Sequence, residues 1–455
     1  MKEVVRNGLI VTMLVILVWF AFLLRATQGF EEHLLPAGLV TMTLGLTLLA
    51  AHIFGRFLAT FGFPLITGYL LAGIFLGPEG LGLVGLEVRD RLLIINRIAL
   101  GLIALTAGGE LALERLKPRL RTIGWVTALH TILIFTATAA GLLAWEVVGR
   151  QLGFESALTA GLGAKQIVVI GLLLGLVATA NSPASTVAVI NEVRARGPMT
   201  TIALGTTVVK DVVVILLMAL TLMLGKGILD PASDLDASQL ARIPVEVAIS
   251  LVLGSLIGLG IIFYLGRVNK ELALFVLAVV ILTIELVEYL DLRLHLHLDF
   301  LLVCIAAGFV VENISEKGEL LIQGLERSSL PVYVVFFTFS GVGLDLTSLL
   351  QIWPLALGFI VWRAILLYTT TWIGAARAGE PIAIREHTWT AFIAQAGVSL
   401  GLAELVAMRL PAIGERLRTF VLAVVALNQL VGPALFKISL KKLGEAGRAD
   451  LPEKG

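Results

Sequence analysis

Charged residues are scarce in this chain, and that scarcity excludes most soluble folds. Of the 455 residues only 15% are charged, while 58% are hydrophobic. A soluble domain carries about 25% charged residues, so a water-soluble fold of this length could not bury so much apolar sequence. The single cysteine, Cys304, lies in an apolar run and excludes an intrachain disulfide. With a formal net charge of +1 and no basic block interleaved with aromatic residues, we expect no nucleic-acid partner.

The motifs of common enzymes and cofactor sites are also missing. The chain has no GxGxxG, Walker, HExxH or GxSxG pattern, so we expect neither an enzyme nor a cofactor. His295 and His297 stand near Asp299 with the spacing of metal ligands. Because they lie at a span boundary, an interfacial segment is favoured, and we expect no metal beyond a transported cation.

Apolar runs cover most of the chain and predict its fold class. A transmembrane helix needs about 20 mostly apolar residues. The sequence therefore predicts an all-α polytopic membrane protein with about 14 transmembrane helices, or 13 if the short run 297–312 does not cross. The N-terminal run is interpreted as a retained helix, with a cleaved signal peptide as the alternative. The predicted spans are 7–25, 35–53, 63–83, 95–112, 122–147, 167–192, 199–225, 244–266, 271–291, 297–312, 329–349, 354–377, 387–409 and 417–438.

The distribution of Lys and Arg between the loops predicts the orientation. With 14 spans both termini share one side, and that side carries 20 basic residues against 11 on the other. Basic loop residues favour the cytoplasmic side. We therefore expect both termini in the cytoplasm. Arg97, Lys210 and Arg363 are the basic residues inside predicted spans.

Three ionisable residues lie deep in predicted spans: Lys210, Asp211 and Arg363. Burying each of these groups in the bilayer costs at least a few kcal/mol of free energy. Such a residue is therefore expected to have a function or a partner. Asp211 can bind a small cation or a proton but not both, and that competition is a minimal mechanism for exchange. Arg363 is a permanent positive charge, with Asp211 or the carbonyl ends of an interrupted helix as expected partners. The alternative is a buried ion pair that only joins helices.

Asn181, Ser182 and Pro183 fall in the middle of the sixth predicted span. Pro183 has no amide hydrogen and clashes with the carbonyl of Thr179, so we expect an interrupted helix, with a simple proline kink as the alternative. Unpaired backbone at membrane depth is tolerated where it lines a cavity, and such a break is typical of a transporter site. Thr179, Asn181, Ser182 and Ser185 would supply oxygen atoms there.

A second, weaker interruption lies seven spans later. The segment 387–409 contains Gln395, Gly397, Ser399 and Gly401. Because seven is odd, the two segments cross in opposite directions, as an inverted repeat of spans 2–7 in spans 9–14 predicts. Gln395 therefore joins Asp211, Lys210, Thr179, Asn181 and Ser182 as a candidate ion- or proton-binding residue.

Several segments together resemble the cation:proton antiporter superfamily, especially its bacterial Kef-like and Na⁺/H⁺ antiporter branch. The similarity covers about 35–440, and the motifs follow the family's order. They are FGFPLITGYLLAGIFLGPEGLGLV (61–84), LGLIALTAGGELALERL (100–116), ATANSPASTVAVINEVRARGP (178–198), LGTTVVKDVVVI (204–215), VVFFTFSGVGLDLTSL (334–349) and LNQLVGPALFKISL (427–440).

The resemblance implies a homodimer in the cell (inner) membrane, built from an interface domain and a mobile core domain. In that family the core carries two crossed, interrupted helices, which map to 178–186 and 395–399, and it moves in an elevator-like step. The essential aspartate maps to Asp211 and the basic residue of a later core helix to Arg363. We expect no counterpart of the nucleotide-sensing C-terminal domain of Kef-type proteins.

We therefore expect exchange of a monovalent cation, Na⁺ or K⁺, for protons at Asp211, with Arg363 compensating charge. The expected organisation is an extra helix and loop at 1–34, a first repeat at 35–225 with the ion-site helix at 199–225, a linker and connecting helix at 226–266, a second repeat at 267–438 and a short tail at 439–455.

Lys210 departs from the family, which has Asp, Asn or Gln at this position, and it leaves three hypotheses. In the first, Lys210 gives up its proton as the cation binds Asp211. In the second, Lys210 is locked to a carboxylate such as Asp211 or Glu110, and the protein is a sensor without transport. In the third, the positive site binds an anion, and the protein is an anion or organic-anion carrier.

Overall fold

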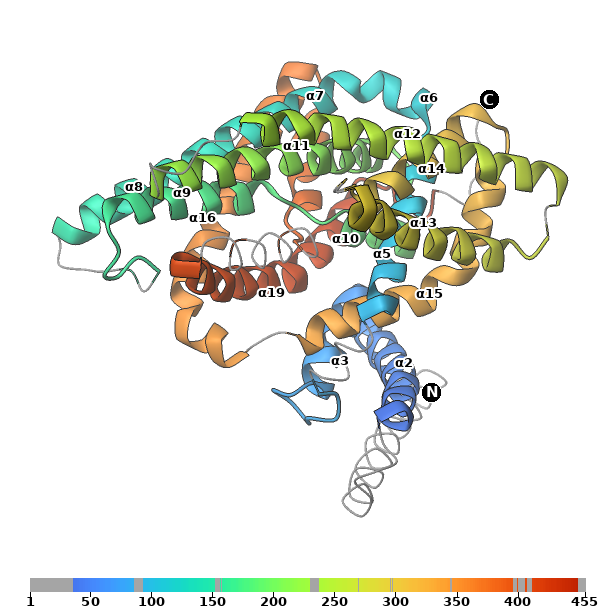
Figure 1. Ribbon diagram of the computed structural model, residues 1–455, viewed down its shortest axis with the longest axis horizontal. Coiled ribbons are helices and arrows are strands. Elements are labelled where there is room, and N and C mark those ends of the chain that lie inside the picture. Colours follow the sequence, from blue (N-terminus) through green and yellow to red (C-terminus); the bar gives the residue numbers. More distant parts are fainter. Residues whose placement is uncertain are drawn as a thin grey trace, which may run out of the picture.

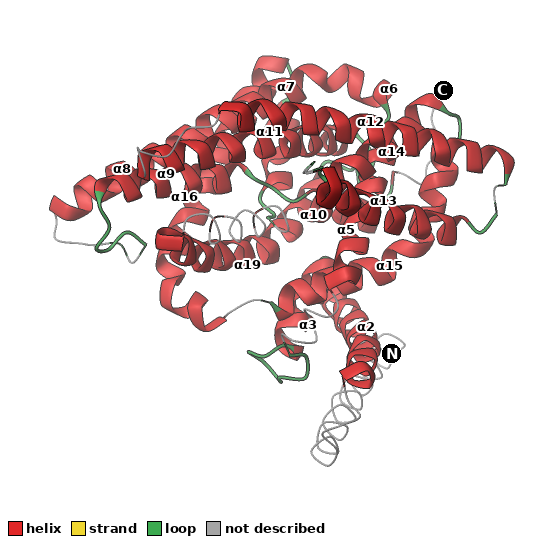
Figure 2. Ribbon diagram, in the orientation of Figure 1, coloured by secondary structure: helices red, strands yellow, loops and turns green. Residues whose placement is uncertain are grey.

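A computed structural model describes residues 36–85, 93–151, 156, 158–229, 237–268, 270–294, 296, 298–343, 346–395, 399, 406 and 411–448. Every regular element within these ranges is a helix, which confirms the predicted all-α class (Figure 2). The first predicted span, 7–25, lies outside the described residues, as do His295 and His297.

The helices follow the predicted spans with some differences in length. They are α2 (Pro36–Thr60), α3 (Leu65–Leu76), α5 (Leu93–Gly109), α6 (Leu113–Leu116), η2 (Lys117–Arg119), α7 (Leu120–Leu129), the π-helical η3 (His130–Ile134), α8 (Phe135–Gln151), α9 (Ala164–Thr179), α10 (Pro183–Val193), α11 (Pro198–Leu229), α12 (Ala237–Arg267), α13 (Leu272–Leu294), α14 (Phe300–Ile314), α15 (Gly318–Val342), α16 (Leu346–Ala378), α17 (Ile382–His387), η4 (Thr388–Phe392) and α19 (Pro411–Lys442).

Some predicted boundaries were wrong. The span 63–83 ends as a helix at Leu76, because Gly77 is extended and Gly82 adopts a positive φ of 62° in the following turn. Helix α15 starts at Gly318, well before the predicted 329, since its first turns are amphipathic rather than apolar. The span 387–409 likewise begins earlier, with α17 at Ile382.

Within the described residues, seven helical stretches are long and apolar enough to cross a membrane. They are Leu113–Gly149, Ala164–Val193, Pro198–Leu229, Pro244–Arg267, Leu272–Leu294, Ile352–Ala378 and Arg416–Lys442. Shorter apolar helices stand beside them at Leu44–Thr60, Leu65–Leu76, Ile94–Gly109, Phe300–Ile314 and Pro331–Val342. These helices support a multi-pass membrane protein.

The described helices pack in two groups (Figure 1). One group contains α2, α3, α5 and α12 to α15, and the other contains α7 to α11, α16, α17, η4 and α19. The groups meet where α10 packs against α5 and α3, where α19 packs against α3, and where α11 packs against α12. The second group contains both predicted interruptions.

Two close helix crossings in the first group rest on paired glycines. A Cβ at Gly73 of α3 would clash with the carbonyl of Thr338 on α15, and one at Gly341 of α15 would clash with the carbonyl of Leu70 on α3. The same arrangement joins Gly108 of α5 to Gly308 of α14. If spans 2–7 repeat as 9–14, α5 corresponds to α15 and α3 to α14, so the two crossings are equivalent. Small residues allow such close backbone approach in membranes.

Candidate functional site

The first interruption is a complete break between α9 and α10, so the proline-kink alternative is wrong. Helix α9 ends at Thr179, and Pro183 occupies the first turn of α10, where its missing N–H costs nothing. Ser182 is extended and caps α10, because its Oγ accepts the Ser185 N–H at 3.1 Å. Residues 180–182 therefore form a short extended segment buried in the protein.

The second interruption begins after η4, at Ile393. The two breaks cross, since the Ser182 N–H donates to the Ala394 carbonyl at 2.9 Å and the Thr186 hydroxyl to the Ala391 carbonyl at 3.3 Å. The crossed arrangement that the family resemblance implied is thus present. Most of 396–410, including Gly397 and Gly401, lies outside the described residues.

Arg363 of α16 joins the two breaks. Its guanidinium is 1% exposed and donates to the carbonyls of Ala178, Ala180 and Ile393 at 2.8 Å and of Phe392 at 2.9 Å. The last carbonyls of a helix lack intrahelical partners and carry the negative end of its dipole. Of the two partners expected from the sequence, the carbonyl ends are therefore the correct one, and Asp211 is not.

Gln395 also braces the crossing. Its Nε2 donates to the carbonyls of Val177 at 2.6 Å and Ala180 at 3.2 Å, and its Oε1 accepts from Asn428 Nδ2 at 2.8 Å. Thr179 is turned back onto its own helix, where its hydroxyl donates to the Gly175 carbonyl at 2.9 Å. Both side chains thus shape the break through contacts with the backbone.

Asn181 lies in the extended segment and is 2% exposed. Its Nδ2 donates to Thr207 Oγ1 at 3.1 Å, whereas its Oδ1 has no donor among the described residues. Thr207 stands four residues before Asp211, so the two share one face of α11. Asn181 therefore contacts α11 one helical turn before the candidate carboxylate, and its Oδ1 is a buried acceptor without a donor among the described residues.

Asp211 itself is half-buried in α11. The charged groups that act on it are Asp299, at the start of α14, and Lys210. Asp299 caps α14, where its Oδ1 accepts the N–H groups of Leu301 at 2.8 Å and Leu302 at 3.3 Å. Helix α11, which carries Asp211, packs against α12 of the other helix group.

Lys210 is 1% exposed, and its partner is a residue that the sequence analysis did not single out. Its Nζ lies 3.2 Å from His130 Nδ1 and 5.4 Å from the ring centre of Phe392. No ion pair of Lys210 with Asp211 or Glu110 occurs within the part of the chain that the structure describes. The locked lysine–carboxylate pair of the second hypothesis is therefore not what the geometry shows.

His130 is fully buried at the start of the π-helical turn η3. Its Nε2 lies 2.9 Å from Thr371 Oγ1 of α16, and its ring packs edge-on against Phe392. The sequence could have pointed to His130, because it is a histidine inside the predicted span 122–147. An ionisable residue at membrane depth is costly and usually has a functional role or a partner. π-Helical turns frequently mark functional sites, but they are invisible in sequence.

A cavity of about 740 Å³ opens beside the N-terminal part of α11. Its lining includes Thr200, Thr201 and Leu204 of α11 and charged side chains of both signs, among them Glu110, Arg115, Arg194, Arg196, Glu312 and Glu319. Leu204 precedes Asp211 by seven residues, so the two lie on one face of the helix, roughly 10 Å apart along its axis. The cavity thus lies beside the first two turns of the helix that carries Asp211.

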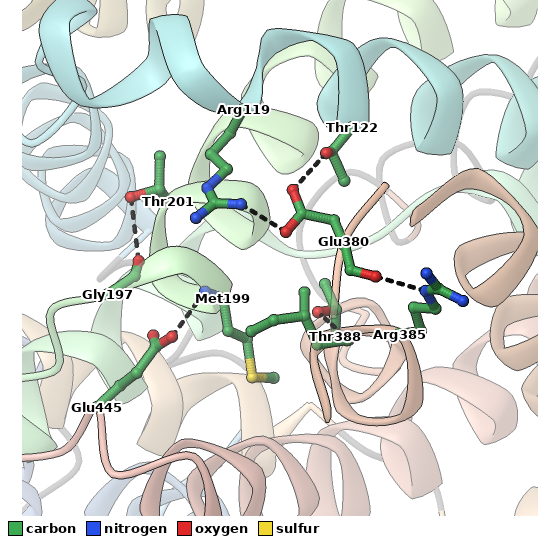
Figure 3. Close-up of polar contacts among 10 residues, drawn as sticks. Arg119, Thr122, Gly197, Met199, Thr201, Glu380, Arg385, Thr388 and Glu445 are labelled. Atoms are coloured by element: carbon green, nitrogen blue, oxygen red, sulfur yellow. Dashed lines mark hydrogen bonds and ion pairs between the residues drawn. The ribbon is translucent and has the colours of Figure 1, made fainter. Parts of the chain in front are cut away.

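Figure 3 shows polar contacts at the ends of helices that carry the candidate site. Glu380 accepts from Arg119 Nη1 at 2.5 Å and from the Thr122 hydroxyl at 2.6 Å, which ties α7 to the turn after α16. Glu445, beyond α19, accepts the Met199 N–H at 2.7 Å. These contacts fix the ends of helices that carry the site.

Comparisons with known proteins agree with this architecture. Two structures of the sodium proton antiporter MjNhaP1 from Methanocaldococcus jannaschii match the fold. One has 14% identity and a TM-score of 0.62 over 89% of this chain and 98% of that one. The other has 16% identity and a TM-score of 0.64 over 92% and 100%. A search of curated proteins found no match.

The family comparison covers most of the sequence. The family described as "Sodium/hydrogen exchanger, transmembrane" matches residues 44–442. Its members are transporters rather than enzymes. The chain therefore belongs to the sodium/hydrogen exchanger family of cation/proton antiporters.

Proposed function

We propose that this protein exchanges Na⁺ or K⁺ for protons and that the cation binds at Asp211. The observation that supports this most is the half-buried Asp211 on α11, one helical turn after Thr207, which contacts Asn181, whose Oδ1 accepts no hydrogen bond among the described residues. Carboxylate and amide oxygens are hard ligands that suit alkali cations as they suit other hard cations. Thr207, between the two residues, adds a hydroxyl oxygen to the same face.

The charge balance of the site indicates which residue carries the transported proton. With Lys210 and Arg363 charged and Asp211 ionised, the site holds a net charge of +1, and a bound Na⁺ would raise it to +2 in a region of low dielectric, which is unfavourable. Release of one proton from Lys210 as the cation binds keeps the charge constant. We therefore propose one-for-one exchange, with the proton carried by Lys210.

The anion-carrier alternative has less support. Arg363 donates to four backbone carbonyls, which uses four of the five N–H groups of its guanidinium. Lys210 would then be the cation left for an anion, and the neighbouring Asp211 would repel that anion. The carboxylate and the spare amide oxygen favour a cation.

The two helix groups suggest how access alternates. The site belongs to the group of α7 to α11, α16, α17, η4 and α19, and its helix α11 packs against α12 of the other group. We propose that the site group moves past the other in an elevator-like step, and that the other group forms a homodimer. The cavity beside Leu204 would be the cytoplasmic entrance.

The experiment is ion flux in proteoliposomes that contain a pH dye, with pulses of Na⁺, K⁺ or Li⁺ outside. Wild type should move protons in response to at least one cation, and Asp211→Asn should not. Glu114→Gln, which neutralises an exposed carboxylate at the start of α6, should behave as wild type.

Each result has a defined meaning. A wild-type response that Asp211→Asn abolishes supports antiport at Asp211, and the responding ion is the substrate. If no cation moves protons, the proposal is wrong, and uptake of labelled anions or the absence of any flux distinguishes the carrier from the sensor.

A further inference from the structure

We propose that His130 is the residue that lets Lys210 bind and release the transported proton inside a dry site, by exchanging hydrogen-bond donor and acceptor roles with it. The inference rests on the proposed function, because it takes Lys210 as the proton carrier. Neither the family match nor the sequence motifs assign a role to His130.

Because Lys210 is buried, its hydrogen-bond partner controls how easily it can hold a proton. Lys210 is 1% exposed and His130 is not exposed at all, so bulk water does not solvate either side chain. A buried ammonium needs an acceptor, and the acceptor that the structure provides is His130 Nδ1 at 3.2 Å. The Phe392 ring, which contacts both groups, adds a cation–π contact at 5.4 Å.

The imidazole suits both protonation states of Lys210. When Lys210 is an ammonium, Nδ1 must be unprotonated, and the ring carries its hydrogen on Nε2. When Lys210 is a neutral amine, the other tautomer donates its Nδ1–H to the amine nitrogen. Histidine is the side chain whose two nitrogens exchange these roles.

Thr371 completes the arrangement on the far side of the ring. Its Oγ1 lies 2.9 Å from His130 Nε2. A threonine hydroxyl both donates and accepts, so it satisfies Nε2 whether that nitrogen is protonated or not. Neither tautomer therefore leaves a buried ring nitrogen without a partner.

The surrounding charges limit the pair to one excess proton. The charged groups that act on His130 are Lys210 on α11 and Arg363 on α16, both positive. A second proton would place an imidazolium beside an ammonium in a low-dielectric site. The proton balance is one for one: the pair releases one proton to the solution that supplies the cation as the cation binds Asp211, and it takes one proton back when the cation leaves.

The test is the pH dependence of apparent cation affinity in proteoliposomes. In wild type the affinity should rise with pH until Lys210 is neutral. His130→Leu removes the acceptor that stabilises the ammonium, so Lys210 loses its proton more readily. The midpoint should move to lower pH by about one unit, which corresponds to about tenfold higher apparent affinity on the acidic side.

A second variant tests the same inference without changing His130 itself, in case His130→Leu does not fold. Thr371→Val leaves Nε2 without a partner in either tautomer, so the ring is held less firmly against Lys210 and the ammonium loses part of the support of its acceptor. It should move the midpoint in the same direction by a smaller amount. The matched control is Thr370→Val, since the Thr370 hydroxyl donates to the Leu366 carbonyl of its own helix and should leave the midpoint unchanged.

A double variant shows whether the effect passes through Lys210. In a Lys210→Gln background, His130→Leu should no longer move the midpoint. Unchanged midpoints in His130→Leu and Thr371→Val, together with normal wild-type antiport, would overturn the inference while leaving the proposed function intact. Absence of cation-driven proton flux in wild type would instead reject the proposed function.

Discussion

The Glu445 carboxylate accepts the backbone N–H of Met199 at 2.7 Å, and it also accepts the N–H of Thr200 at 2.8 Å and its hydroxyl at 2.7 Å. Met199 and Thr200 lie in the first turn of α11, whose N–H groups have no intrahelical partner. The segment after α19 therefore caps the helix that carries Lys210 and Asp211 (Figure 3).

Replacing Glu445 with Ala should destabilise the protein by about 1–3 kcal/mol, because it leaves buried N–H groups unpaired. A thermal unfolding curve in detergent measures the effect as a lower midpoint. Lys441→Ala is the control, since Lys441 is exposed near the end of α19. Equal midpoints for the two variants would show that the cap adds no stability.

Arg363→Lys should disrupt the crossing although it keeps the positive charge. The guanidinium reaches four carbonyls on two segments at once, and a lysine ammonium has only three donors on a single atom. We expect a loss of several kcal/mol in stability and no transport. Arg377→Lys, an exposed change in the last turn of the same helix, should have little effect on thermal stability or flux.

Asn181→Ala should weaken cation binding rather than abolish exchange. If Oδ1 is a ligand, its removal raises KM for the cation by about tenfold, equivalent to about 1.4 kcal/mol, and changes the maximal rate less. Asn191→Ala is matched in residue type and lies on the adjoining α10, where Asn191 Nδ2 donates to the Tyr333 hydroxyl. A KM as low as wild type in Asn181→Ala would exclude Oδ1 as a ligand.

A Gly→Ala change should have opposite effects on stability at a paired glycine and at an unpacked one. Gly73→Ala should cost about 1–3 kcal/mol, because its Cβ meets the Thr338 carbonyl of α15. Gly358→Ala, in α16, meets no atom within 4 Å and should be neutral or stabilising by up to about 1 kcal/mol. Thermal unfolding of both variants tests the crossing, and a stable Gly73→Ala protein would contradict it.

The proposed entrance predicts accessibility from one side of the membrane. Thr201→Cys, on the cavity wall, should react with a membrane-impermeant maleimide, whereas Val214→Cys, 2% exposed on the same helix, should not. The one native cysteine, Cys304, is 2% exposed, so wild type gives the background. Labelling in inside-out vesicles but not in intact cells is expected; the reverse would place the cavity on the outer side.

Much of the fold followed from local patterns in the sequence. Apolar runs predicted the helices, since hydropathy over about 20 residues reports the membrane directly. The break after Thr179 followed from Pro183, because a proline acts on the backbone of its own segment. Asp211, Lys210 and Arg363 stood out because charge is rare in apolar spans. The dimer, the sidedness of the termini and the repeat boundaries stay predictions.

The partners of those charges were decided only by the tertiary structure. Arg363 had two possible partners in the sequence, and the crossing of segments around 180 and 393 selected the carbonyl ends. His130 and Lys210 lie 80 residues apart, and a π-helical turn in one helix sets the ring against the other. Sequence determines which groups must be satisfied inside the membrane, because burial of polar atoms is costly whatever the fold. Which group satisfies which depends on helix packing, because a hydrogen bond requires contact within about 3 Å.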